Sequence, residues 1–369
     1  MKHLVLLFIM ATTIASSCSN GSKNNSALTI KRLDSLFSSV YPENEPGAAV
    51  LLLKRDSIVF EKGYGIADMN TGIKIDGNTF FNIASVSKQF SAMALLMLNE
   101  SGALSLDDPV KKWFPEFKAE FYNKIKLSHL LSHTSGIPDS RDRSDRIFVT
   151  TATDIQSYSY LKDLEKLNFD PGTSYEYMNP TFQLMYTIIE KASGENFDEF
   201  IKNRIFTPCG MNASTYFEAD KIIPGMAHGY VYNAENKTFE ECDYGEESFF
   251  ATKADGGLYT SVREFVLWEK ALRNNLLIGN QTLKTAHSPK IKLPDKEYNY
   301  YGYGWFIEEL PGFPVKIYHT GDNGGFQIYA ARFPEKEILM LVFANRNDKD
   351  REANASKAEK ILFDANWLD

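Results

Sequence analysis

The sequence predicts an α/β (α+β) fold in which both ends of the chain contribute to one antiparallel sheet and the middle forms a mainly helical subdomain. Short apolar or alternating segments, typical of strands, lie near both ends, whereas helical spacing dominates between them. One helical pattern opens this region and another closes it. We therefore expect the sheet to be flanked by an N-terminal and a C-terminal helix.

The first 17 residues have the pattern of a lipoprotein signal peptide. A positively charged start precedes an apolar run over residues 4–14, and small residues follow it. This run is too short to cross a bilayer as a helix. Because Cys18 ends a segment that resembles a bacterial lipobox, we expect lipidation there; secretion with an unmodified cysteine is the alternative. We expect an exported cell-envelope protein that contacts the membrane only through this anchor.

A flexible tether and then the globular domain are expected to follow. Residues 18–27 are small and polar, which favours a tether. A helix over about 28–45 precedes two strands, 47–53 and 57–68, which a Lys-Arg-Asp turn joins into a hairpin. We assign the domain to 28–365, with the sheet part at about 28–80 and 255–365 and the helical part at about 81–254.

The last quarter of the chain returns to strand patterns and closes with a helix over 355–368. The expected strands are 301–309, 315–321, 326–333 and 337–345. Cys209 and Cys242 could pair in an oxidising compartment or remain two free thiols, and their positions in the sequence leave both alternatives open.

Composition excludes some classes of function. The 369-residue chain is long enough for one large domain or two interleaved subdomains. A net charge of −8 and the lack of a basic tract argue against nucleic acid as a partner. Because the His and Cys residues show no metal-ligand spacing, we expect no metal and no other cofactor.

A helical segment over 80–102 is apolar on nearly every side, which predicts a buried helix. Ser85 and Lys88 lie near its start, one turn apart on the same face. Free N–H groups and the helix dipole favour an anion there, so a serine in this place suits nucleophilic catalysis. The alternative is a structural serine beside a lysine that extends to solvent. A second such pair, Ser159 and Lys162, lies in a polar stretch and is interpreted as an exposed helix face.

Two further motifs each occur once. Tyr177-Met178-Asn179 lies in a predicted loop before a helix, and His319-Thr320-Gly321 lies at the end of a predicted strand. In the order Ser-x-x-Lys, Tyr-x-Asn and His-Thr-Gly, the motifs resemble those of the penicillin-recognising serine hydrolases. The most similar branch contains class C β-lactamases, D-Ala-D-Ala carboxypeptidases and family VIII-type esterases. Other segments share the resemblance, which covers roughly 28–365: 130–137, 177–211, 255–265 and 319–326.

This resemblance implies a β-lactamase/transpeptidase-like fold with a five-stranded sheet, and it implies roles for residues. Ser85 matches the acylated nucleophile, and Lys88 matches the amine that helps to remove its proton. Tyr177 matches the phenol that acts as base or as acid toward the leaving group. Which of Lys88 and Tyr177 is the general base stays open. Asn179 matches the amide that orients the lysine and the substrate carbonyl.

The resemblance also implies the oxyanion hole and the strand that contacts the substrate. The hole would consist of the backbone N–H groups of Ser85 and Asp322, and glycines would let the backbone approach closely. Thr320, Gly321 and Gly324 match substrate-binding positions. His319 stands where β-lactamases usually carry Lys. We interpret His133 as a buried, hydrogen-bonded structural residue and His228 as a packing residue.

Two departures from the family pattern bear on the activity. Met178 replaces the common Ser or Ala, and His319, only partly charged near pH 7, replaces a lysine. Both favour a D-Ala-D-Ala-type peptidase or an esterase over an efficient β-lactamase. We expect a monomer that acts on a small-molecule or peptide substrate, chosen by residues in 139–170 and 230–250. A non-catalytic envelope lipoprotein that binds peptidoglycan stem peptides or a partner protein is the alternative.

Overall fold

The computed structural model describes residues 14–140, 145, 148, 151–218, 223–242 and 252–368, with side chains from residue 25 onward. Most of the expected signal peptide and the side chain of Cys18 therefore lie outside the described residues. Parts of the segments expected to select the substrate, near 141–150 and 243–251, also lie outside them.

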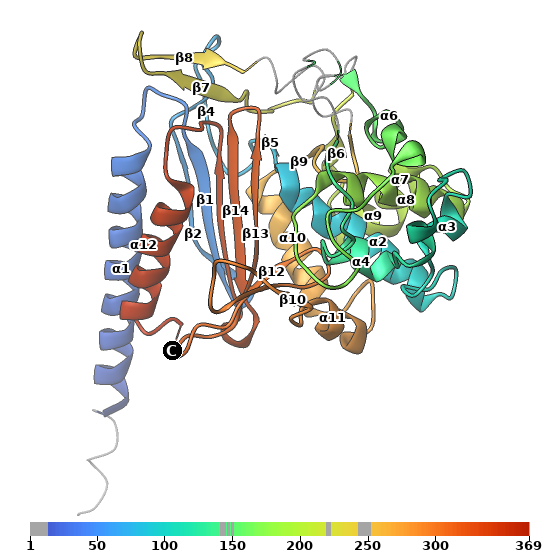
Figure 1. Cartoon of the computed structure of the whole chain (residues 1–369). Helices are drawn as coiled ribbons and strands as arrows, with labels where there is room; N and C mark the ends of the chain where they lie inside the picture. Colours follow the sequence, from blue (N-terminus) through green and yellow to red (C-terminus); the bar gives the residue numbers. More distant parts are fainter. Residues whose placement is uncertain are drawn as a thin grey trace, which may run out of the picture.

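One antiparallel sheet of eight strands forms the centre of the molecule (Figure 1), in the order β10-β11-β12-β13-β14-β15-β1-β2. Five of its strands are long: β1 (Ala48–Lys54), β2 (Ser57–Tyr64), β13 (Lys316–Asn323), β14 (Phe326–Phe333) and β15 (Ile338–Ala344). The two ends of the chain meet where β1 pairs with β15, with Ala48 opposite Ala344. The shared antiparallel sheet is thus confirmed.

The sheet is wider than the five strands expected. Three short strands extend it beyond β13: β10 (Ile291–Lys292), β11 (Asn299–Tyr301) and β12 (Phe306–Glu308). Strands of two or three residues carry too little alternation to be recognised from sequence, and they form here because each pairs with its neighbour. The segment expected as one strand over 301–309 is in fact divided between β11 and β12.

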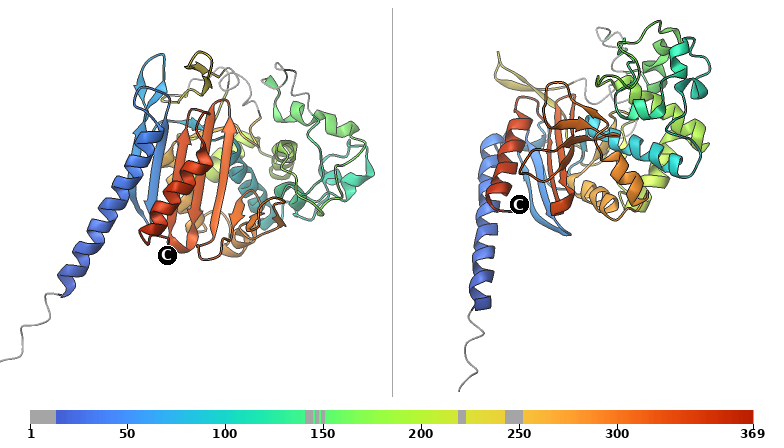
Figure 2. Two further views of the ribbon diagram at one scale, coloured as in Figure 1. Left: turned by 60° about the vertical axis from the view of Figure 1, so that its left-hand side comes forward. Right: turned by 60° about the horizontal axis from the view of Figure 1, so that its bottom comes forward.

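Two helices from opposite ends of the chain cover one face of the sheet. The helices α1 (Ile14–Val40) and α12 (Arg351–Asp364) contact each other there, and α1 extends beyond the sheet (Figures 1 and 2). The flexible tether expected at 18–27 is wrong in this structure, because α1 runs through it. The Asn25 side chain donates to the Ala365 carbonyl at 3.3 Å, which joins α1 to the C-terminal end of the chain at that residue.

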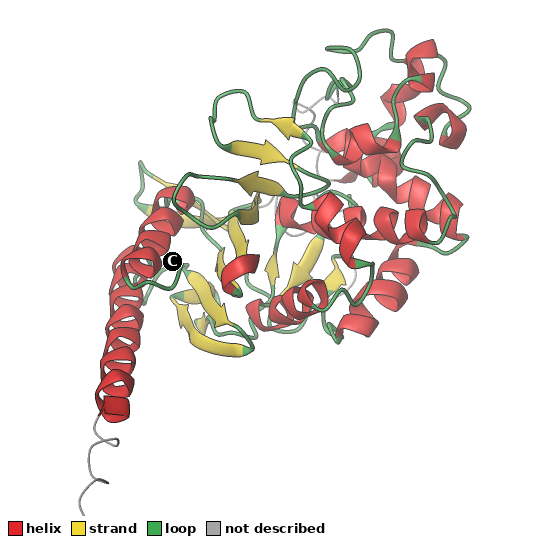
Figure 3. Cartoon of the chain, turned by 90° about the horizontal axis from the view of Figure 1, so that it is seen from below, coloured by secondary structure: helices red, strands yellow, loops and turns green. Residues whose placement is uncertain are grey.

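The helical part lies on the other face of the sheet and beyond its edge (Figure 3). The longest helices on this side are α2 (Lys88–Glu100) and α7 (Asn179–Ser193), which contact each other, and α10 (Val262–Arg273), which follows the helical part in the chain and packs on β1 and β15. The shorter helices are α3 (Val110–Trp113), α4 (Leu127–Leu131), α6 (Asp154–Ser157), α8 (Phe197–Ile201), α9 (Thr207–Cys209) and α11 (Asn280–Ala286).

Three small sheets complete the described structure. They pair β3 (Ile66–Asp68) with β4 (Ile73–Lys74), β5 (Phe81–Asn82) and β6 (Thr215–Tyr216) with β9 (Leu258–Thr260), and β7 (Tyr230–Asn233) with β8 (Thr238–Glu241). Cys209 and Cys242 form no disulfide, and burial raises the pKa of Cys209 to about 12. Within the described ranges, every helix is too short or too polar to span a membrane.

Candidate active site

Ser85 lies in a tight turn just before the central helix. The turn is a 3₁₀ segment, Ala84–Ser87, and α2 begins only at Lys88. Ser85 was expected on the helix itself, but it lies three residues before the helix begins. Ala84 has a φ of +46°, an uncommon backbone conformation for a residue with a Cβ. The Asn82 side chain accepts the Ala84 N–H at 2.7 Å. This turn leaves Ser85 partly exposed between buried neighbours, as a nucleophile requires.

Lys88 is fully buried, and its ammonium group is shared by three acceptors. It donates to Ser85 Oγ at 3.0 Å, to Asn179 Oδ1 at 3.0 Å and to the carbonyl oxygen of Asp255 at 2.8 Å. The alternative in which Lys88 extends to solvent is therefore wrong. In contrast, Ser159 and Lys162, the other pair with this spacing, are both exposed, as expected.

The Tyr177 phenol lies beside the same pair. The Lys88 Nζ is 5.1 Å from the centre of the Tyr177 ring. Burial raises the pKa of Tyr177 well above its ordinary value, and the nearby Ser85 hydroxyl lowers it in part. The phenol oxygen is buried, yet its contact with Ser85 does not meet the geometry of a hydrogen bond. Tyr177 is thus protonated at neutral pH and next to the nucleophile.

The lack of a side chain at Gly321 lets β13 pack closely against the turn that carries Ser85. A Cβ on Gly321 would lie 2.4 Å from the Ile83 carbonyl oxygen and 3.0 Å from the Ala84 Cβ, so only glycine fits. Thr320 and Asp322 flank it on β13. Gly324 lies in the turn between β13 and β14 with a φ of +50°. The expected close approach of this strand to the nucleophile is present.

His319 differs from the expectation of a partly charged residue. Its Nδ1 lies 2.7 Å from the Thr320 carbonyl oxygen and therefore carries the proton, while Nε2 accepts from the Tyr301 hydroxyl at 3.0 Å. The side chain is only 1% exposed. Burial and the nearby Lys88 charge lower the pKa of His319 to about 3. His319 is neutral at pH 7 and cannot attract a substrate carboxylate by charge.

His133 supports the loop that presents Tyr177. Its Nδ1 accepts from the Met178 N–H at 3.2 Å, and its ring lies 4.2 Å from that of Tyr177. It is buried and hydrogen-bonded as expected, although its Nε2 has no partner among the described residues. His228 is not a packing residue either: it is partly exposed, and its Nδ1 lies 3.0 Å from Glu241 Oε1.

Sequence reasoning missed a second layer behind Lys88. Asp154 accepts from the backbone N–H groups of Lys253 at 2.7 Å and Ala254 at 3.1 Å. The next residue, Asp255, supplies the carbonyl that holds Lys88, and its side chain accepts from Gln183 at 3.1 Å. Burial, and then the neighbouring Asp255, raise the pKa of Asp154 well above its ordinary value. Only the unusual Ala-Asp-Gly-Gly segment at 254–257 was a signal for this layer in the sequence.

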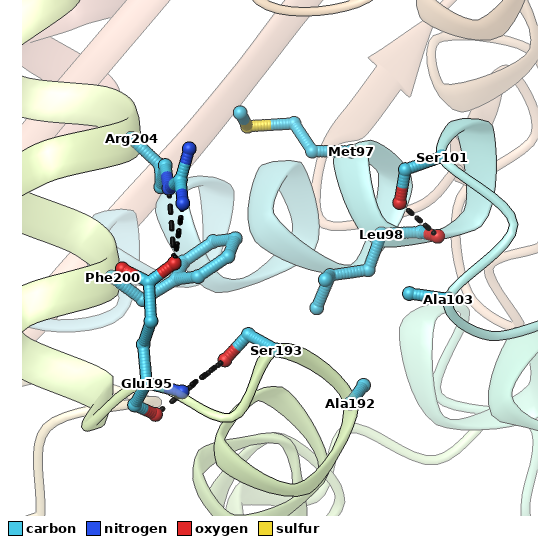
Figure 4. A pocket seen from close by; sticks show the side chains of 9 residues that line it. All are labelled: Met97, Leu98, Ser101, Ala103, Ala192, Ser193, Glu195, Phe200 and Arg204. Atoms are coloured by element: carbon cyan, nitrogen blue, oxygen red, sulfur yellow. Dashed lines mark hydrogen bonds and ion pairs between the residues drawn. The ribbon is translucent and has the colours of Figure 1, made fainter.

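A separate pocket lies at the opposite ends of the two helices that supply Lys88 and Asn179. It encloses about 330 Å³ and is formed by the C-terminal residues of α2 and α7 together with α8 and Arg204 (Figure 4). The Arg204 guanidinium is paired with Glu195, with Nη2 2.7 Å from Oε1. The pocket includes none of the candidate catalytic residues. Within the described residues, no group of three or more His, Cys, Asp or Glu side chains is arranged to hold a metal ion.

Comparisons with known proteins place this geometry in a family. The family model described as Beta-lactamase matches residues 38–363. Penicillin-binding protein 4* of Bacillus subtilis is 29% identical over 347 residues, which cover 90% of this chain and 76% of the relative. The octameric penicillin-binding protein homologue from Pyrococcus abyssi has a TM-score of 0.78 at 26% identity, covering 95% of this chain and 78% of that one. The penicillin-binding protein from Bacillus halodurans has a TM-score of 0.77 at 26% identity, covering 90% and 99%.

Proposed function

The chain belongs to the Beta-lactamase family, and we propose that this serine hydrolase cleaves an ester or amide through an acyl-enzyme formed on Ser85. The observation that carries the proposal is the contact between the Lys88 ammonium nitrogen and Ser85 Oγ at 3.0 Å, in a site where Ser85 is partly exposed and Lys88 is buried. Once the Lys88 ammonium has lost one proton to solvent, the resulting amine at that distance can accept the hydroxyl proton as the serine attacks a carbonyl carbon.

The proposed reaction divides the proton transfers between two residues. Ser85 Oγ forms a bond to the substrate carbonyl carbon while its proton passes to Lys88 in its neutral form. As the bond to the leaving group breaks, Tyr177 donates its proton to the leaving atom, a role that suits a phenol with a raised pKa. Lys88 then returns a proton to Tyr177, and water hydrolyses the acyl-enzyme by the same steps in reverse order.

We assign the backbone N–H groups of Ser85 and Asp322 to the oxyanion hole. Support comes from Gly321, whose close approach to Ile83 puts the end of β13 beside the Ser85 turn. Asn179 would orient Lys88 and the substrate carbonyl, and Thr320, Gly321 and Gly324 would line the substrate strand. The oxyanion-hole amides would act on the charge that develops on the carbonyl oxygen, where fixed dipoles are most effective.

An esterase or a D-Ala-D-Ala-type peptidase fits this site better than an efficient β-lactamase. Because neutral His319 offers no charge to any substrate carboxylate, such a peptidase would act on substrates whose C-terminal carboxylate is blocked. We further propose an exported, monomeric lipoprotein anchored at Cys18. Replacement of Cys18 by Ser should move the protein from the membrane fraction to the soluble fraction, and an unchanged distribution would contradict lipidation.

Active-site labelling tests the catalytic proposal. Full-length protein is exposed to a fluorophosphonate and to a panel of acyl donors, and adducts are located by mass spectrometry. We expect one adduct, on Ser85, that disappears in Ser85→Ala and persists in Ser159→Ala, the matched control from the second Ser-x-x-Lys pair. No adduct and no turnover, together with peptide binding that is unchanged in Ser85→Ala, would instead favour a non-catalytic binding protein.

A further inference from the structure

Aromatic side chains surround the Tyr177 phenol on the side of β12 and β13. Phe306 lies nearly parallel to the Tyr177 ring, with 6.3 Å between centroids and 10° between planes. It is also 4.8 Å from the His319 ring and 4.8 Å from the Tyr301 ring. Tyr177 and Phe306 are partly exposed, so a bound molecule can contact them. Because Tyr177 is the proposed proton donor to the leaving group, these rings lie on the leaving-group side of the site.

His319 provides no charged group on the side of the site where Phe306 lies. Both ring nitrogens are occupied, Nδ1 by the Thr320 carbonyl and Nε2 by the Tyr301 hydroxyl. The Tyr301 hydroxyl is in turn committed to His319, and its ring is fully buried. A ligand would therefore meet aromatic surfaces rather than a charged imidazole.

Two cations, Lys88 and Arg351, lie close enough to lower the pKa of His319, and most of their N–H donors already have acceptors. Lys88 donates to the three acceptors given above. Arg351 donates to the Gly321 carbonyl at 2.6 Å, and its guanidinium lies 3.7 Å from an Asp322 oxygen and 3.5 Å from a Glu352 oxygen. Its side chain is only 13% exposed. A carboxylate bound beside Phe306 would lose water, while the three donors of Lys88 and the Nη1 donor of Arg351 are already taken by other acceptors.

We propose that the leaving-group subsite of this protein, lined by Phe306 and Tyr177 with His319 buried beside them, accepts an uncharged apolar or aromatic leaving group and discriminates against one that ends in a free carboxylate. The inference rests on the proposed acyl-enzyme function and deepens it. The preferred substrates are esters of neutral alcohols and acyl-D-amino-acid derivatives whose C-terminal carboxylate is amidated or esterified, rather than peptides that end in free D-alanine.

The test compares two substrates that differ in one charge. Acyl-D-Ala-D-Ala and its C-terminal amide are each measured for kcat/KM and, independently, for protection of Ser85 from fluorophosphonate. We expect the amide to be favoured by about tenfold or more in both measurements, because the free acid must desolvate a carboxylate against aromatic rings. Equal values, or a preference for the free acid, overturn the proposal.

The protection assay keeps the test decisive if neither peptide is hydrolysed. If Ser85 is not labelled at all, the proposed function fails; if Ser85 is labelled but the free acid protects as well as the amide, only the leaving-group proposal fails. The Phe306→Arg variant then tests whether Phe306 determines the preference for the amide. We expect this preference to fall about tenfold, because the arginine supplies a cation beside His319. Phe313→Arg is the matched control: Phe313 is 43% exposed and stacks on Phe363 of α12, so the preference should not change.

Discussion

Lys88 and Asn179 are the first residues of α2 and α7, and a hydrogen bond of 3.0 Å joins them. They are 91 positions apart in the chain. The N-terminal ends of two long, packed helices therefore meet at the nucleophile. Since each helix is anchored by buried apolar residues along its length, the amine and the amide are held in place by the core rather than by a loop.

Removal of the Lys88 amine should abolish most activity. In Lys88→Met the side chain keeps a similar length but becomes apolar, and Ser85 loses the group that we propose accepts its proton. We expect kcat/KM for an ester substrate to fall about 10²- to 10⁴-fold, the range for loss of a positioned acid or base. The rate of fluorophosphonate labelling should fall in parallel. Lys162→Met, in the exposed second pair, serves as the control and should keep wild-type rates.

A methyl group on Gly321 should separate β13 from the Ser85 turn. In Gly321→Ala the new Cβ would meet a backbone carbonyl at 2.4 Å, which cannot move as a side chain can. We expect a loss of about 1–3 kcal/mol in the free energy of unfolding, measured by urea denaturation, together with a lower rate of acylation. Gly279→Ala meets only the flexible Glu100 carboxylate at 3.2 Å and should change neither quantity appreciably. Full activity in Gly321→Ala would argue against a tight contact between the strand and the turn.

The buried Asp154 carboxyl should affect catalysis through Lys88. Asp154→Asn replaces an acceptor of two N–H groups by an amide that must turn one donor toward them, which shifts residues 253–255 and the carbonyl that holds Lys88. We expect kcat to fall about 10- to 100-fold while KM changes little, because substrate contacts remain. Asp163→Asn, at an exposed ion pair with Lys118, is the control. A rise in KM of the size expected for the fall in kcat, with kcat itself unchanged, would contradict a positioning role.

Acidification should destabilise the protein through its buried neutral histidines. The pKa of His319 is about 3 when folded and near 6.5 when unfolded, so between these values the unfolded chain binds the extra proton. The stability is therefore fully present above about pH 6.5 and is lost as the pH falls toward 3. Burial lowers the pKa values of His133 and His287 in the same direction.

Urea denaturation between pH 4 and 8 measures this dependence. We expect the free energy of unfolding to rise with pH over the lower part of this range, and His319→Gln to have a shallower slope than the wild-type protein because one such group is removed. An identical slope in the variant would mean that His319 is not held neutral in the folded state.

The sequence by itself determined the features that depend on local periodicity and chain order. Five long strands, the flanking helices and the one-turn spacing of Ser85 and Lys88 follow from apolar patterns within a few residues. The order of the three motifs was enough to indicate the family. The short strands β10–β12 could not be predicted in this way, because their pairing partners lie elsewhere in the chain. The helix over 18–27 was not predicted because its residues are small and polar, and their composition favours a flexible segment.

Tertiary structure alone decided the chemical state of the site. Lys88 is buried rather than extended to solvent because Asn179 and the Asp255 carbonyl, both distant in sequence, provide its acceptors. His319 is neutral because Tyr301 and the core surround it, although an exposed histidine of the same sequence would be partly charged. Burial and long-range hydrogen bonds set protonation, and neither is encoded in the spacing of a motif.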